Sequence, residues 1–132
     1  MKKKIIITGG LGYIGTELCK LYSGVSWNNE IIVIDNRFIS ERVNQIRSWN
    51  MEFVHGDILD KELINKYCID ADVVHHLAGV TEVPRTKTES SLEKDEKIKL
   101  VAKEGTQNIL DAINDKCKIV FPSTHVVYEG IE

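Results

Sequence analysis

The chain of 132 residues has no hydrophobic run near the roughly 20 residues that a membrane-spanning helix needs. Its first ten residues, MKKKIIITGG, resemble the charged start of an export signal. However, Ile5–Ile7 is only three apolar residues long, whereas such signals need about 7–15. The net charge of −3 also gives no excess of Lys and Arg to suit nucleic acid. We therefore expect a cytoplasmic protein that binds neither membranes nor nucleic acids.

Cysteine is scarce as well. The three cysteines, Cys19, Cys68 and Cys117, are odd in number and lie far apart in the sequence. They form no CxxC pair and have no Cys–His spacing typical of zinc ligands. We predict neither a disulfide framework nor a metal site, and we interpret the cysteines as reduced packing residues.

What the sequence does have is a regular alternation of short apolar runs and helical patterns. The apolar runs are continuous rather than alternating, which is typical of parallel strands covered by helices on both faces. They are Ile5–Thr8, Ile31–Asp35, Glu52–His55, Asp72–Ala78 and Lys118–Ser123.

The segments between these runs fit helices. After the first run, four apolar positions recur with the spacing of one helix face: Ile14, Leu18, Leu21 and Tyr22. Asp60 is a candidate N-cap for the segment that ends at Tyr67. The last helical pattern has one face formed by Val101, Gly105, Asn108, Ile109 and Ala112.

Strand–helix alternation predicts an α/β fold with right-handed crossovers between parallel strands. We expect a three-layer, doubly wound, Rossmann-like sheet of about five strands in the order 3-2-1-4-5. In such a sheet ligands bind in the crevice at the carboxyl ends of strands 1 and 4.

The first apolar run continues directly into TGGLGYIG. Gly10, Gly12 and Gly15 fit the spacing GxGxxG, and Gly9 begins the related GxxGxxG form. Such glycines permit a tight turn, a close approach of the backbone to a pyrophosphate, and close packing of the helix on the sheet. The helix N-terminus then offers amide donors and a partial positive charge to the phosphates. A strand before and an amphipathic helix after make a dinucleotide site the favoured interpretation over an ordinary glycine turn.

Asp35 ends the second apolar run, 20 positions beyond Gly15. A carboxylate there can accept hydrogen bonds from both hydroxyls of an adenosine ribose, each worth ~1.5–3 kcal/mol. It also repels a 2′-phosphate, so the pattern favours NAD over NADP. Arg37 keeps NADP open, because an arginine at this place could accommodate that phosphate. The plainer alternative for Asp35 is a helix cap or a surface charge.

Two further loops leave the same edge of the predicted sheet. In HGDI, Asp57 can accept a hydrogen bond from an adenine amino group and Ile58 can form an apolar wall for the ring. In HLAG, Ala78 and Gly79 are small enough for the backbone to lie along the nicotinamide ribose. Each loop alone could be ordinary, but together with the glycine turn they predict one nucleotide site.

The combination of motifs resembles the extended short-chain dehydrogenase/reductase family, in its nucleotide-sugar epimerase and dehydratase branch. The likeness is greatest to UDP-glucose 4-epimerase-like proteins and spans essentially the whole chain. The motifs are TGGLGYIG, DN at Asp35–Asn36, GDI at Gly56–Ile58, HLAG at His76–Gly79 and STHVVY at Ser123–Tyr128.

This resemblance implies that the chain binds NAD for the oxidation of a sugar carbinol by hydride transfer. It implies a role for Thr124 in hydrogen bonding the substrate hydroxyl that is oxidised, and for Ser123 in shaping the nicotinamide pocket. His76 would lie beside the cofactor without taking part in proton transfer. The implied cofactor contacts are Gly9, Gly12, Tyr13, Ile14, Gly15, Asp35, Asn36, Ser40, Asp57, Ile58, Leu77, Ala78 and Gly79.

One family feature is missing from the sequence. The family base is a Tyr followed four residues later by a Lys, and none of the four tyrosines has this partner. The last two strands and the substrate lobe of the family also have no counterpart here. We therefore expect residues 1–132 to be an incomplete NAD(P)-binding domain, truncated after strand 5 and inactive alone.

Three interpretations of this truncation stay open. The chain is the first part of a longer epimerase or dehydratase, a stand-alone NAD-binding module or half of a split enzyme, or a non-catalytic interaction protein. A nucleotide-sugar substrate is expected only if the missing lobe is supplied. A sheet that ends at strand 5 has an unpaired edge, so we also expect self-association or a partner strand.

Overall fold

The computed structural model describes the backbone of residues 2–78 and 92–121, and within the second range the side chains of residue 100 and of residues 103–121. The predictions made for Gly79, Ser123 and Thr124 lie outside the described residues.

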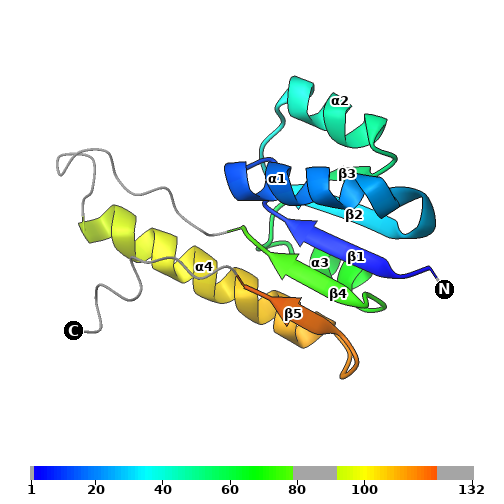
Figure 1. Ribbon diagram of the computed structural model, residues 1–132. Helices are drawn as coiled ribbons and strands as arrows, with labels where there is room; N and C mark the ends of the chain where they lie inside the picture. Colours follow the sequence, from blue (N-terminus) through cyan, green and yellow to red (C-terminus); the bar gives the residue numbers. More distant parts are fainter. Residues whose placement is uncertain (1, 79–91, 122–132) are drawn as a thin grey trace, which may run out of the picture.

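The described residues contain one parallel sheet whose order is β3-β2-β1-β4-β5 (Figure 1). The predicted fold class and the strand order 3-2-1-4-5 are therefore confirmed. The fourth predicted strand was too long, because β4 ends at His76 and leaves Leu77 and Ala78 in the following loop. The strands are β1 Lys4–Thr8, β2 Glu30–Asp35, β3 Glu52–His55, β4 Val73–His76 and β5 Lys118–Val120.

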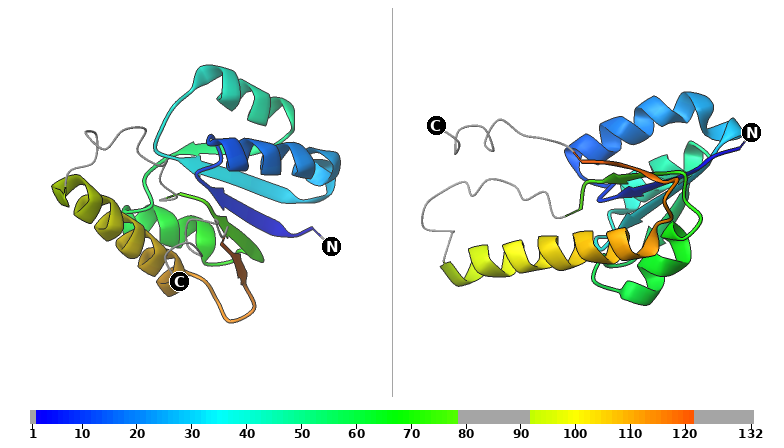
Figure 2. Two further views of the ribbon diagram at one scale, coloured as in Figure 1. Left: turned by 60° about the vertical axis from the view of Figure 1, so that its left-hand side comes forward. Right: turned by 90° about the horizontal axis from the view of Figure 1, so that it is seen from below.

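Helices cover both faces of this sheet (Figure 2). On one face α1 and α2 enclose a core with β1 and β2, and on the other face α3 and α4 enclose a second core. Ile6 and Ile7 of β1 are fully buried on opposite faces, which explains why the strands are continuously apolar. The helices are α1 Tyr13–Tyr22, the 3₁₀ helix η1 Ser23–Asn28, α2 Ser40–Ser48, α3 Lys61–Cys68 and α4 Leu92–Ala112.

The buried face of α1 agrees in part with the one that the apolar spacing indicates, because Leu18 and Tyr22 pack against the core as predicted. Gly15 and Cys19 are buried, whereas Ile14 and Leu21 are exposed. Small residues on this face let the helix lie close to the turn and the sheet, so its closest approach is at Gly15, with Leu18 and Tyr22 packing on the core further along the helix.

The other helix predictions are confirmed where side chains are described. Asp60 is the N-cap of α3, and its side chain accepts a hydrogen bond from the Leu63 amide at 3.2 Å. Gly105 and Ile109 of α4 face the core, and a Cβ on Gly105 would lie 2.2 Å from Ile58 Cδ1. Asn108 of the same face donates to the Ile58 carbonyl at 2.9 Å.

The cysteines serve as packing residues. Cys19 and Cys68 are fully buried on opposite faces of the sheet, and Cys117 is partly buried; all three are free. Burial raises the pKa of the Cys19 and Cys68 thiols to about 12, so both stay protonated. Within residues 2–78 and 92–121, no group of acidic, His and Cys side chains could hold a metal ion. No helix in these ranges is long and apolar enough to span a membrane.

Candidate functional site

The turn that follows β1 is built from glycines that the fold itself requires. Gly9 has a φ of 70°, and a Cβ there would lie 2.7 Å from the Ala78 amide nitrogen. A Cβ on Gly10 would lie 2.2 Å from Val33 Cγ1. On Gly15 it would lie 2.5 Å from both the Gly9 carbonyl oxygen and Gly10 Cα. These three glycines bring the start of α1 against the ends of β1 and β4.

Gly12 differs from the other glycines of this turn. Its φ is −75°, and a Cβ there would lie no closer than 3.5 Å to any neighbouring atom, an ordinary contact distance. The folded chain therefore has room for a larger residue at this position. Gly12 is also the N-cap of α1, so it has no side chain to accept from the first-turn amides, and that turn holds no acidic residue. The N-terminus of α1 is thus suited to an anion.

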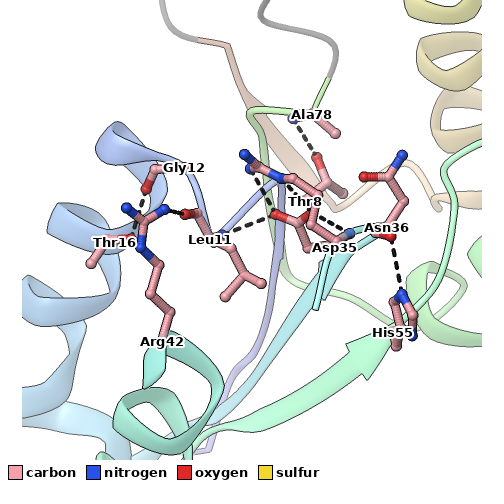
Figure 3. Close-up of polar contacts among 10 residues, drawn as sticks. Thr8, Leu11, Gly12, Thr16, Asp35, Asn36, Arg42, His55 and Ala78 are labelled. Carbon is pink, nitrogen blue, oxygen red and sulfur yellow. Dashed lines mark hydrogen bonds and ion pairs between the residues drawn. The ribbon is translucent and has the colours of Figure 1, made fainter. Parts of the chain in front are cut away.

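Asp35, at the end of β2, faces this glycine turn, with its side chain only 2% exposed (Figure 3). The Leu11 amide donates to Oδ2 at 3.0 Å, and the Arg37 amide donates to Oδ1 at 2.9 Å. The guanidinium of Arg37 forms two further bonds, from Nε to Oδ1 at 3.1 Å and from Nη2 to Oδ2 at 3.2 Å. A fixed carboxylate therefore lies beside the helix N-terminus, as the sequence predicts.

A buried chain of side chains joins the ends of β1 and β4 to α4. The Thr8 hydroxyl accepts from the amides of Leu77 and Ala78, both at 3.1 Å, and lies 2.7 Å from His76 Nδ1. Its two lone pairs are then used, so it donates its proton to Nδ1. Nε2 of this neutral imidazole consequently carries the hydrogen and donates to the Thr106 hydroxyl at 3.1 Å. The network holds the Leu77–Ala78 loop against Gly9.

Residues 6–130 match the 3-beta hydroxysteroid dehydrogenase/isomerase family. The chain belongs to this family. The resemblance to extended short-chain dehydrogenases/reductases, in their NAD-dependent epimerase and dehydratase branch, is thereby confirmed.

Curated relatives of this family member include nucleotide-sugar enzymes. The chain is 35% identical to CDP-paratose 2-epimerase from Salmonella typhi, over 98% of this chain and 39% of the relative. It is 34% identical to UDP-N-acetyl-alpha-D-glucosaminuronate decarboxylase from Bacillus cytotoxicus, over 97% of this chain and 38% of the relative. The chain therefore spans about two fifths of the length of these relatives.

Solved structures of similar proteins support the fold. One is a dTDP-glucose 4,6-dehydratase from Streptomyces venezuelae, solved with NAD bound. It is 26% identical, has a TM-score of 0.65, and is matched over 83% of this chain and 35% of that chain.

The remaining predicted site residues lie around the carboxyl ends of the same parallel strands. Tyr13 is 81% exposed at the start of α1, with the Arg42 guanidinium 5.8 Å from its ring centre. Asn36, in the loop after β2, and Ser40, the first residue of α2, are both exposed. The backbone of Asn36 is held by His55, whose Nε2 donates to its carbonyl at 3.0 Å.

The loop after β3 contains two predicted site residues, Asp57 and Ile58, which differ in their exposure to solvent. Asp57 is exposed, and its carboxylate accepts from the Leu59 amide at 2.9 Å. Ile58 is buried in the core against Gly105, so its side chain lies away from solvent. Leu59 is the more exposed apolar side chain of this loop. The proposed adenine contacts of Asp57 and Ile58 stay predictions.

Sequence reasoning missed three residues of the site: Thr8, Arg42 and Thr106. Arg42 of α2 donates from Nη1 to the Leu11 carbonyl and so ties α2 to the glycine turn. Thr8 had a recognisable signal, because a hydroxyl residue that ends a buried strand needs a partner. Arg42 and Thr106 lie on helices, and the sequence alone does not show which of their residues face the site.

The buried His76 gives the folded protein a characteristic pH dependence. Burial lowers the pKa of the His76 imidazole to about 4, from an ordinary value of 6.5. Between these values the unfolded chain binds a proton that the folded chain does not. The free energy of unfolding therefore falls as the pH drops from about 6.5 to about 4. We expect this group to contribute a loss of about 2 kcal/mol between pH 7 and pH 4.5.

Urea unfolding of the native chain and of His76→Asn at both pH values measures this contribution. The asparagine amide can still accept a hydrogen bond from Thr8 but does not titrate. The native chain should lose about 2 kcal/mol more stability than the variant on acidification. Equal losses in the two proteins would contradict a buried, neutral His76.

Proposed function

We propose that this chain binds NAD at the carboxyl edge of its sheet, as the dinucleotide-binding part of a nucleotide-sugar epimerase or dehydratase. The observation that carries this proposal is the pairing of Gly12 with Asp35. Gly12 leaves space above the N-terminus of α1, although the fold has room for a larger residue there. Asp35 presents a fixed carboxylate beside that N-terminus. Phosphates and a ribose diol require these two groups side by side.

Each part of the dinucleotide has a corresponding part of the site. The pyrophosphate would lie on the first-turn amides of α1 above Gly12, and the adenosine ribose would bond to Asp35. Tyr13, Asn36 and Ser40 would border the nucleotide, and Leu77, Ala78 and Gly79 would lie along the nicotinamide ribose. The carboxylate favours NAD, because a 2′-phosphate at Asp35 would meet a negative charge.

The chemistry of the whole protein is proposed from its relatives. NAD, when bound, supplies the hydride acceptor for oxidation of a sugar carbinol. The task of residues 1–132 is to hold and orient it, with Thr124 bonding the substrate hydroxyl and Ser123 shaping the pocket. Because the sequence contains no Tyr-x-x-x-Lys pair, it supplies no family base, and we assign the binding step to it rather than the complete reaction. A stand-alone NAD-binding module, or half of a split enzyme, is the alternative in which the same site serves.

Calorimetric titration of the chain tests this proposal. NAD should bind with one site per chain and a dissociation constant of about 1 mM or lower, a range usual for enzyme ligands. NADP should bind more weakly, because the Asp35 carboxylate repels its 2′-phosphate. The proposal fails if neither nucleotide binds at a concentration of several times that value.

A further inference from the structure

In the free protein the carboxylate proposed to bind ribose already has a complete set of hydrogen bonds. Oδ1 accepts from the Arg37 amide and from Arg37 Nε, and Oδ2 accepts from the Leu11 amide and from Arg37 Nη2. Each carboxylate oxygen offers two lone pairs, so all four positions on Asp35 are used. A ribose diol can therefore bond to Asp35 only if some of these donors leave.

The guanidinium of Arg37 is the donor group that can leave. Its side chain is 48% exposed, whereas that of Asp35 is 2% exposed. Both backbone donors belong to the tight connections after β1 and β2 and cannot move without disturbing the loops. The guanidinium, in contrast, can move by rotation about the single bonds of its own side chain. Its departure leaves both backbone amides bonded to the carboxylate.

The position of the guanidinium also coincides with the proposed nucleotide site. Arg37 Nη2 lies 3.5 Å from the point where a Cβ of Gly12 would be, while also bonding Asp35 Oδ2 at 3.2 Å. It thus spans the gap between the glycine turn and the carboxylate. This gap is where a ribose joined to a pyrophosphate on α1 would have to lie.

We propose that Arg37 is a displaceable competitor for the ribose site. This inference rests on the proposed nucleotide site. When NAD binds, the ribose hydroxyls take the places of Nε and Nη2 on Asp35. Arg37 therefore weakens NAD binding.

The substitution Arg37→Ala tests this exchange, with Arg47→Ala as the matched control. Arg47 is an exposed arginine at the end of α2, beside Met51 and Ile31 at the amino ends of the strands and so away from the proposed site. Its loss changes the net charge by the same amount. Removing Arg37 should tighten NAD binding about two- to five-fold, as expected for loss of a partly exposed ion pair. Arg47→Ala should leave NAD affinity within about two-fold of the native value.

The outcomes separate this inference from the proposed function. If the native chain binds no nucleotide, the proposed function itself is overturned. If it binds NAD and Arg37→Ala leaves the NAD affinity unchanged, the nucleotide site stands and the competitor role is wrong. A variant that loses affinity for NAD also contradicts that role, because it shows Arg37 only supporting the loop. Urea unfolding of each variant confirms that the chain compared is folded.

Discussion

The Gly15→Ala variant is expected to lose about 2–4 kcal/mol of unfolding free energy and to bind NAD at least ~10-fold more weakly. The added methyl would lie 2.5 Å from the Gly9 carbonyl oxygen and from Gly10 Cα, both backbone atoms. No side chain can rotate to relieve these contacts, so α1 has to move away from the glycine turn. That movement separates the helix N-terminus from the ribose carboxylate. Urea unfolding and calorimetric NAD titration measure the two effects.

Gly24→Ala is the matched control for this substitution. Gly24 is exposed in η1, and a Cβ there would meet no atom within 4 Å. The same chemical change should leave NAD affinity unaltered and raise stability by at most about 1 kcal/mol. If Gly15→Ala behaved like Gly24→Ala, the close approach of α1 to the turn would be contradicted.

Gly12→Ala is expected to weaken NAD binding while leaving the stability of the fold almost unchanged. Its nearest contacts would be at 3.5 Å and its φ suits any residue, so stability should change by less than about 1 kcal/mol. NAD affinity should nevertheless fall at least ~10-fold, because the methyl would occupy the space through which the backbone approaches the pyrophosphate. The two measurements are again urea unfolding and calorimetric titration.

The pair of glycine variants distinguishes a structural requirement from a ligand requirement. Three residues apart, one alanine should disturb both fold and binding, and the other binding alone. A Gly12→Ala chain that is stable and binds NAD as the native chain does would remove the observation on which the proposed function depends.

The sequence predicted most of the sheet because its parallel strands are buried on both faces. Such strands must be continuously apolar, so Ile5–Thr8 and Ile31–Asp35 were recognisable without knowledge of their neighbours. The strand order followed from the handedness and compactness of strand–helix–strand units. The glycine turn and Asp35 were predictable because each stands at the end of such a strand.

Other features depended on contacts between distant parts of the chain. The apolar spacing placed Ile14 on the buried side of α1, but the close approach at Gly15 turns the helix so that Ile14 is 52% exposed. The tautomer of His76 follows from four hydrogen bonds that involve β1, α4 and the loop after β4. The ion pair between Arg37 and Asp35 likewise depends on side-chain conformation, which no pattern of residue types specifies.

The central claim is that NAD binds where the glycine turn, Asp35 and the loop after β4 meet. An NAD titration followed through the backbone amide resonances of the chain tests it most directly, because each resonance reports one position. If NAD binds there, the amides of Gly12, Arg37 and Ala78 should show saturable shifts, and the amide of Asn50, at the amino ends of the strands, should show none. Shifts confined to the amino ends of the strands, or no shifts with NAD in excess, would contradict the claim.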